Sequence, residues 1–342
     1  MTALHHRSRA GFTLIELLVV IAILAVLSAI GVGTYFRVRG SSEVKANETT
    51  VAKLSTGLNQ QWSAERDTAE KEFKDNTYSL PIQTLTNFAA GDRDRAKALW
   101  MHLRMKNTFP QTFLEAATAT NFTPTGLALY NTSLPRRATF AAVAGLKDVT
   151  TINLPLIEPA NAADVNEPNT QAAVLLYLML TQRAGRGAAF SDEAAGSLTK
   201  TVRFKIKDAT NVDQFYDFKV YSDTYGTPLT YVRWATNPEI DAAPFVKPNQ
   251  GKDPFDPLKR LTAGGGWTIQ PATPVSSAAA GAGFGLAPAN VFNTNWLPTI
   301  ICAGANKNWD GLNVNAGGLV TVPTDTDNIL GYRLRREGER GN

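Results

Sequence analysis

The stretch Gly11-Phe12-Thr13-Leu14-Ile15-Glu16, followed by the uncharged run from Leu17 to Phe36, decides the fold of this chain. The run holds 20 residues, which is long enough for a helix to cross the hydrocarbon core of a bilayer. Between Arg9 and Arg37 the only charged side chain is Glu16. A carboxylate at bilayer depth costs about 2 to 3 kcal/mol, so we expect Glu16 to have a partner and a purpose.

These residues resemble the cleavage and assembly signature of type IV prepilins and of the pseudopilins of type II secretion. The resemblance implies that a membrane prepilin peptidase cuts between Gly11 and Phe12 and then methylates the new amino terminus on Phe12. It also implies assembly with other pilin or pseudopilin subunits into a filament, through an inner-membrane assembly platform and its ATPase. The expected location is the inner (cytoplasmic) membrane, crossed once, with the head in the periplasm or at the cell surface.

The residue types suit this chemistry. The leader is short and basic, with Arg7 and Arg9, and basic segments tend to stay on the cytoplasmic side. Gly11 has no side chain, so the backbone can enter a tight protease site. After cleavage, Glu16 can neutralise the amine of Phe12 in its own chain or on a neighbour, and in the family the second arrangement sets the register of assembly. The alternative is a signal anchor whose glutamate lies at the interface by chance.

Small side chains recur every four positions in the apolar run, at Ala25, Ala29 and Gly33. This spacing lines one face of a helix with residues that let helix backbones approach closely in lipid. We therefore predict a helix-packing face here. In a plain membrane anchor the same residues would only face lipid.

The sequence predicts an α+β protein of the type IV pilin-like class. Its long N-terminal helix would pack its outer half on a globular head that carries an antiparallel sheet and an enlarged central region. Apolar residues at i, i+3, i+7 and i+11 predict that the helix continues to about Glu65; they are Val51, Leu54, Leu58 and Trp62. The expected segments are the leader 1–11, the transmembrane and assembly helix 12–36, its amphipathic continuation 37–75, and the head 76–342, in which 76–200 is the unusual elaboration and 201–342 holds the sheet and C-terminal loop.

Local patterns predict several elements of the head. Helices are expected at 92–105, from an apolar face, and at 172–180, from a short apolar run that we expect to be buried. Alternation of apolar and basic residues predicts a strand at 201–207. Two further strands, 217–222 and 229–234, flank Asp223-Thr-Tyr-Gly-Thr-Pro228, a stretch that resembles a turn of the major pseudopilins.

The C-terminal loop resembles the calcium loop of the type II secretion major pseudopilin. The resemblance rests on the stretch from Ile300 to Gly311 and on Asp325-Thr-Asp-Asn-Ile329. Calcium prefers several oxygen ligands on a flexible loop, and the expected ligands here are Asp310, Asp325, Asp327 and Asn328. The alternative is a cluster of Asp and Asn side chains that bond the backbone of their own turns.

Composition excludes other classes of function. The net charge is +4, which is too small to suggest nucleic acid binding. Cys302 is the single cysteine, so an intrachain disulfide or thiolate cluster is not possible. Only His102 remains once His5 and His6 leave with the leader, so we expect neither a histidine-based metal site nor a Ser-His-Asp triad. Ser197-Leu-Thr-Lys200 lacks the companion motifs of penicillin-recognising enzymes. We predict a filament subunit rather than an enzyme; the alternatives are an adhesive minor pilin and a signal-anchored envelope binding protein or enzyme.

Overall fold

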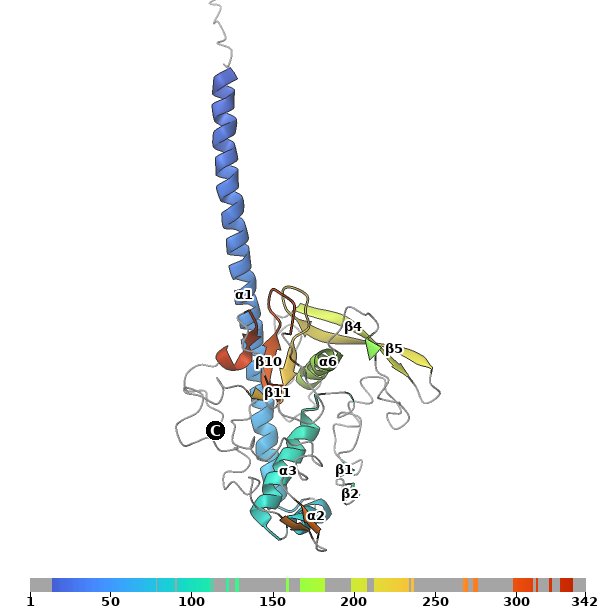
Figure 1. Ribbon diagram of the computed structural model, residues 1–342. Coiled ribbons are helices and arrows are strands. Elements are labelled where there is room, and N and C mark those ends of the chain that lie inside the picture. The colour runs from blue at the N-terminus through green and yellow to red at the C-terminus, as the bar shows by residue number, and fades with distance from the viewer. Residues whose placement is uncertain are drawn as a thin grey trace, which may run out of the picture. The chain divides into compact units, whose positions relative to one another are not determined.

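The structure is a computed structural model, and it describes the following residues: 14–77, 79–89, 91–111, 113, 121–122, 127–128, 158–159, 167–181, 198–207, 212–233, 235–236, 267–269, 273–275, 298–309, 312, 320–321 and 327–334. The chain divides into two compact units, with the boundary between Ala46 and Asn47. Helix α1, Leu14–Lys74, runs through this boundary and is drawn in blue to cyan in Figure 1. The predicted leader residues and Phe12 lie outside the described residues.

Helix α1 has 61 residues and contains no proline. Glu16 lies in its first turn and Lys71 and Lys74 in its last, and each charge is favourable with respect to the helix dipole. Just beyond the helix, Asn76 has a φ of 51°, and the N–H of Thr77 donates to the Glu72 carbonyl at 3.0 Å. A left-handed residue with such a bond is a common helix terminator.

From Asn47 onward, α1 belongs to the second unit and carries the predicted stripe. Val51, Leu54 and Leu58 are fully buried, and Trp62 is 3% exposed, which confirms the stripe. The stripe continues through Ala69 and Phe73. The helix ends at Lys74, beyond the end near Glu65 that the stripe predicts and close to the end of the expected segment 37–75. The outer half of the helix therefore packs on the head, as the predicted fold requires.

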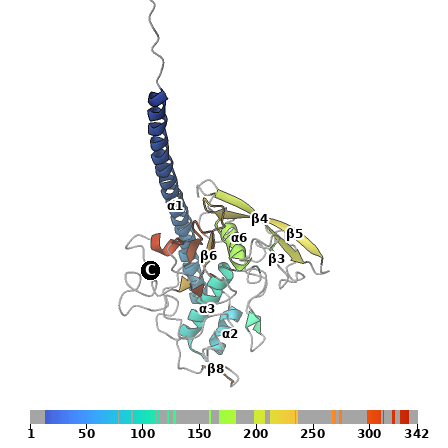
Figure 2. The ribbon, with the colours of Figure 1, turned by 45° about the horizontal axis from the view of Figure 1, so that its top comes forward.

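Helix α3, Arg93–Thr108, confirms the helix expected at 92–105. It begins after Asp92, whose carboxylate accepts hydrogen bonds from the backbone N–H groups of Asp94 and Arg95. The indole of Trp100 donates to the carbonyl of Ala69 at 3.1 Å, which joins α3 to α1 inside the core. Figure 2 shows α3 and the shorter α2, Ser79–Phe88, beside this part of α1.

Helix α6, Glu167–Thr181, contains the buried run that the sequence placed at 172–180. Ala172, Val174 and Leu176 are fully buried, so this helix belongs to the core of the head. The side-chain amide of Gln61 on α1 donates to the carbonyl of Met179 at 3.2 Å. This bond satisfies one of the carbonyls that the last turn of a helix leaves without an intrahelical donor.

Two three-stranded antiparallel sheets form the strand part of the head. In the first, β4, Leu198–Lys207, lies between β3, Glu158–Pro159, and β5, Asp213–Ser222. In the second, β10, Thr299–Cys302, lies between β6, Thr230–Val232, and β12, Ile329–Leu330. The strands expected at 201–207 and on either side of 223–228 are therefore confirmed, although β6 ends before residue 234 and β5 and β6 belong to different sheets.

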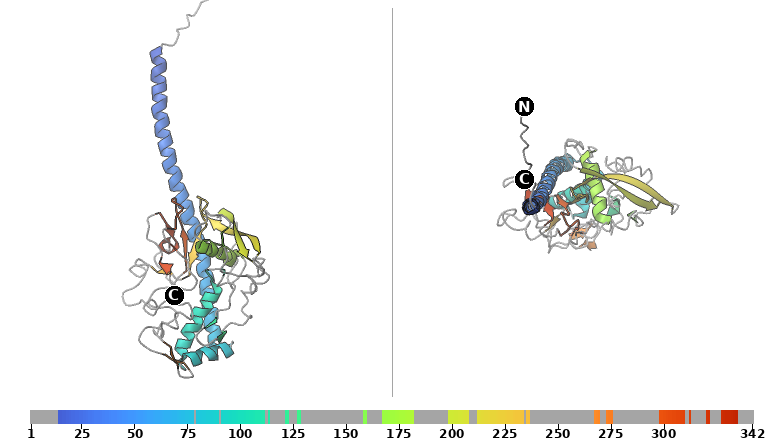
Figure 3. Two further views of the ribbon diagram at one scale, coloured as in Figure 1. Left: turned by 45° about the vertical axis from the view of Figure 1, so that its right-hand side comes forward. Right: turned by 90° about the horizontal axis from the view of Figure 1, so that it is seen from above.

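Side chains of the first sheet divide between core and solvent as the alternation predicts. Val202 and Phe204 are buried, while Arg203 is exposed and pairs with Asp217 directly opposite on β5. Tyr177 of α6 packs on Tyr221 of β5, with ring centroids 5.1 Å apart. Figure 3 shows α6 beside the β4–β5 hairpin in both views.

The remaining described strands form short pairs. Two pairs are antiparallel: β1, Asn121–Phe122, with β2, Leu127–Ala128, and β8, Trp267–Ile269, with β9, Thr273–Val275. One pair is parallel, β7, Ala235–Thr236, with β11, Val320–Thr321. The 3-10 helix η3, Gly331–Leu334, follows β12. The α+β class is confirmed, and the strands belong to several small sheets rather than to one.

Candidate functional site

The inner half of α1 exposes a continuous apolar surface. Leu14, Ile23 and Ile30 are more than half exposed, and so are most of the large apolar residues around them. An 18-residue stretch of α1 has a mean hydropathy of 2.8, and none of this stretch is buried in the part of the chain that the structure describes. By length and composition, α1 can cross a membrane.

Glu16, the predicted assembly residue, lies on this surface in the first helical turn, and its role in assembly stays a prediction. Gly11 and Phe12, the predicted cleavage and methylation positions, lie outside the described residues. Ala25, Ala29 and Gly33 are all on the exposed helix, and a Cβ added to Gly33 would meet no heavy atom within 4 Å. The helix-packing role of these three residues stays a prediction, because their expected partner is another helix.

The turn 223–228 joins the two main sheets. The carboxylate of Asp223 accepts hydrogen bonds from the backbone N–H groups of Tyr225 and Thr227, at 2.9 and 2.7 Å. Gly226 has a φ of 80°, in the left-handed region that favours glycine. Thr224, which follows Asp223, donates its N–H to the side chain of Asn47 on α1 at 2.8 Å. The turn thus ties both sheets to the point where α1 enters the head.

A buried thiol completes this turn. The Cys302 thiol of β10 donates to the second oxygen of Asp223 at 3.4 Å, and both residues are almost fully buried. Burial raises the pKa of the Cys302 thiol to about 12. Burial also raises the pKa of the Asp223 carboxyl, while the N–H groups of Thr227 and Tyr225 act in the opposite direction. Cys302 is therefore a buried thiol of low reactivity.

A second turn follows β10 and is held by Asp327. The carboxylate of Asp327 accepts hydrogen bonds from the backbone and side-chain N–H groups of Asn306, both at 3.1 Å. Gly304 has a φ of 72°, and a Cβ there would lie 2.2 Å from the Asp327 carbonyl oxygen. Close approach of the two segments therefore requires glycine at this position.

These contacts bear on the predicted calcium site. Asp327 bonds a turn, which is the alternative role that the sequence leaves open, and Asn328 is buried. Asp310 and Asp325 lie outside the described residues. Among the residues that the structure describes, no group of three or more His, Cys, Asp or Glu side chains is placed to hold a metal ion. Calcium binding therefore stays a prediction that depends on Asp310 and Asp325.

One buried charged cluster was not anticipated from the sequence. The Arg104 guanidinium of α3 contacts Glu72 at 2.9 Å and Glu65 at 3.3 Å, and Thr108 donates its hydroxyl to Glu65. The three charged side chains are about one-tenth exposed or less. The sequence holds a signal for this cluster, because Glu65 and Glu72 are seven residues apart and therefore lie on the same face of α1 as the buried stripe.

Comparison with known proteins identifies the N-terminal segment. Residues 6–32 match the model of the prokaryotic N-terminal methylation motif. No curated protein and no solved structure matches the chain. The match supports a type IV pilin-like prepilin that a prepilin peptidase processes and that assembles with other pilins, a class of structural rather than enzymatic proteins.

Proposed function

We propose that this protein is a structural subunit of a type IV pilus-like filament or a type II secretion pseudopilus. The observation that carries the proposal is the methylation motif at residues 6–32, which overlaps the exposed apolar inner half of α1. A helix surface of this kind requires lipid or other helices around it. A filament supplies the helices, and the cytoplasmic membrane supplies the lipid before assembly.

The proposal assigns a role to each segment. Residues 1–11 are the leader, 12–36 cross the inner membrane and later form the filament interior, 37–75 continue the helix, and 76–342 form the head outside the cytoplasm. An assembly platform and its ATPase lift the subunit from the membrane. The flanking charges alone do not fix this orientation, since Arg7 and Arg9 precede the apolar run and Arg37, Arg39 and Lys45 follow it. The processing motif is what favours a cytoplasmic leader.

Processing is tested by Gly11→Val in cells that contain a prepilin peptidase. We expect the variant to insert in the membrane and to keep its leader, because valine brings a branched side chain to the cut. Gly40→Val is the matched control, since a Cβ at Gly40 meets no heavy atom within 4 Å and the site is remote from the cut. Normal maturation of Gly11→Val would contradict the prepilin assignment.

Assembly is tested by Glu16→Ala in cells that form filaments. We expect normal cleavage and a folded head, but strongly reduced incorporation into filaments, because the amine of Phe12 would lose its carboxylate partner among apolar helices. Loss of one partner of such a buried pair destabilises by roughly 3 kcal/mol. Wild-type yield of filaments from the alanine variant would show that Glu16 has no role in assembly.

The size of the head favours a second candidate, an adhesive minor pilin whose enlarged region 76–200 binds a surface. Filament preparations distinguish the two, because a major subunit forms the bulk of the filament and a minor one is scarce in it. A signal-anchored envelope protein is a third outcome, and it would retain Met1.

We also propose that calcium orders the C-terminal loop through Asp310, Asp325, Asp327 and Asn328. Oxygen ligands of this type suit calcium, and ion binding would stabilise the head by mass action. Thermal unfolding of residues 40–342 with calcium and with chelator tests this proposal. A shift of several degrees that disappears in Asp325→Ala supports the site, and equal melting temperatures leave Asp327 only its bonds to Asn306.

A further inference from the structure

The two turns of α1 that follow the apolar run have two unlike faces. On one face, Arg39 donates to Glu43 at 2.8 Å, and Tyr35 lies one turn earlier on the same side. On the other face, the spacing of four residues aligns Arg37, Ser41 and Lys45. At 3.6 residues per turn, Arg37 and Arg39 point roughly 200° apart around the helix. The first face carries the Arg39–Glu43 ion pair, and the second carries the side chains of Arg37, Ser41 and Lys45.

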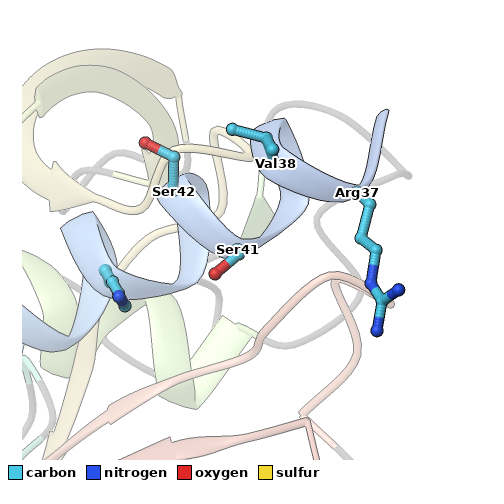
Figure 4. A pocket seen from close by; sticks show the side chains of 5 residues that line it. Arg37, Val38, Ser41 and Ser42 are labelled. Carbon is cyan, nitrogen blue, oxygen red and sulfur yellow. The ribbon is translucent and has the colours of Figure 1, made fainter. Parts of the chain in front are cut away.

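A shallow hollow borders the second face and is lined by Arg37, Val38, Ser41, Ser42 and Lys45. We call the side chains of Arg37, Ser41 and Lys45 the Arg37 face. In Figure 4, Arg37 and the Ser41 hydroxyl extend to one side of α1, and Val38 and the Ser42 hydroxyl to the other. All five residues are exposed, and Arg37 forms no ion pair with any part of the chain that the structure describes.

The position of this face along the helix indicates its surroundings. The apolar run ends at Phe36, so Arg37 is the first residue beyond the hydrocarbon core if residues 17–36 span it. The headgroup layer is roughly 5 to 8 Å deep on each side of a bilayer, and five residues of helix cover about that depth. Residues 37–41 therefore lie among the headgroups, and Lys45 reaches back to them with its long side chain.

We propose that the Arg37 face binds the phosphate of an anionic phospholipid in the outer leaflet of the inner membrane. This inference rests on the proposed function, because it requires residues 17–36 to span the bilayer. A guanidinium donates two parallel hydrogen bonds to phosphate oxygens, hydroxyls donate further bonds, and an ammonium adds a point charge. The side chains of Arg37, Ser41 and Lys45 provide all three groups on one face. The lipid would hold the subunit at a defined depth until extraction breaks the contact.

The test uses the full-length chain reconstituted in phosphatidylcholine vesicles, with spin-labelled phosphatidylglycerol or spin-labelled phosphatidylcholine as the probe. Electron paramagnetic resonance then measures how much of each probe is immobilised beside the protein. A basic residue near an anionic lipid contributes about 1 kcal/mol, which corresponds to roughly a fivefold preference per residue. We expect the wild-type chain to prefer phosphatidylglycerol and Arg37→Gln/Lys45→Gln to lose most of that preference. The matched control, Arg39→Gln/Glu43→Gln, keeps the net charge and should keep the preference.

Insertion is measured in the same samples by resistance to alkaline extraction. Failure of the wild-type chain to insert would overturn the proposed function. Normal insertion with equal immobilisation of both probes would overturn only the lipid site. The site is also overturned if Arg37→Gln/Lys45→Gln keeps the wild-type preference for phosphatidylglycerol. It is overturned as well if carbodiimide cross-links Lys45 to a carboxylate of a second copy, because the partner of Lys45 would then be protein and not lipid.

Discussion

The inner and outer halves of α1 differ in what covers them. Before Asn47, large apolar residues such as Leu24, at 55% exposed, have no cover within the described chain. After it, Leu54 and Leu58 are fully buried under the head. Both halves form one uninterrupted helix, so local sequence preference does not explain the difference. The inner half is arranged for surfaces outside the chain, and the outer half is part of the core.

This difference separates stability from assembly. Substitutions in the outer half should act on the free energy of unfolding of the head, because its side chains are packed. Substitutions in the inner half should act on membrane residence and filament formation and leave the head unchanged. The predictions below test that separation, beginning with the largest effect.

The buried charge cluster should be the most sensitive point. Arg104→Met leaves Glu65 and Glu72 buried without their cation, and removal of one partner of a buried ion pair costs about 3 to 5 kcal/mol. Urea unfolding measures the loss. Lys97→Met is the control, because Lys97 joins the same two helices through Glu70 at the surface, where such pairs contribute less than about 1 kcal/mol. Equal losses of unfolding free energy in the two variants would show that burial of the cluster does not add to its effect on stability.

A matched pair of leucines tests the two halves directly. Leu54→Ala should destabilise the head by about 2 to 5 kcal/mol, because it leaves a cavity in the core. Leu24→Ala makes the same chemical change on the exposed half and should leave urea unfolding unchanged. If both variants shift the unfolding midpoint equally, the separation of the two halves is wrong.

Glycine substitutions in the two turns of the head come next. Gly304→Ala places a Cβ 2.2 Å from the Asp327 carbonyl oxygen in a left-handed backbone, which should cost about 1 to 3 kcal/mol or more. Gly226→Ala has a similar φ but meets no heavy atom within 4 Å, so it should cost only about 1 to 2 kcal/mol. The difference in thermal stability between them measures the contact with Asp327. No difference would mean that the segment carrying Asp327 moves away easily.

The last prediction concerns the reactivity of a buried thiol and involves no loss of stability in the wild-type head. At pH 8, native Cys302 should resist iodoacetamide, because its thiol is buried and burial raises its pKa to about 12. Labelling should follow unfolding of the head in urea. Ser41→Cys adds an exposed thiol to the other unit, and it should react rapidly without urea. Rapid reaction of native Cys302 would contradict the packing of β10.

The sequence predicts the parts of this fold that depend on local periodicity. The stripe of Val51, Leu54 and Leu58, the strand at 201–207 and the turn around Gly226 each depend on neighbours in the chain, and each is confirmed. Contacts between distant segments were missed because local patterns do not encode them. The Asp223–Cys302 bond is the clearest case, since its partners are 79 residues apart. The parallel pairing of β7 with β11 is another.

At the candidate site, the sequence predicts the identity of the residues better than their contacts. Glu16 was singled out because it is the only charge in an apolar run; the structure places it in the first turn of α1, and its role in assembly stays a prediction. Asp327 was assigned to calcium on the basis of composition and resemblance. Its bonds to Asn306 depend on how two distant turns meet, which composition does not reveal.

The mass of the amino-terminal peptide tests the central claim most directly. The protein should be isolated from membranes of cells that contain a prepilin peptidase and then analysed by mass spectrometry. A prepilin-like subunit predicts a mature chain that begins at Phe12 with one added methyl group on its amine. A chain that begins at Met1, or that is cut at a position other than the Gly11–Phe12 bond, would contradict the account.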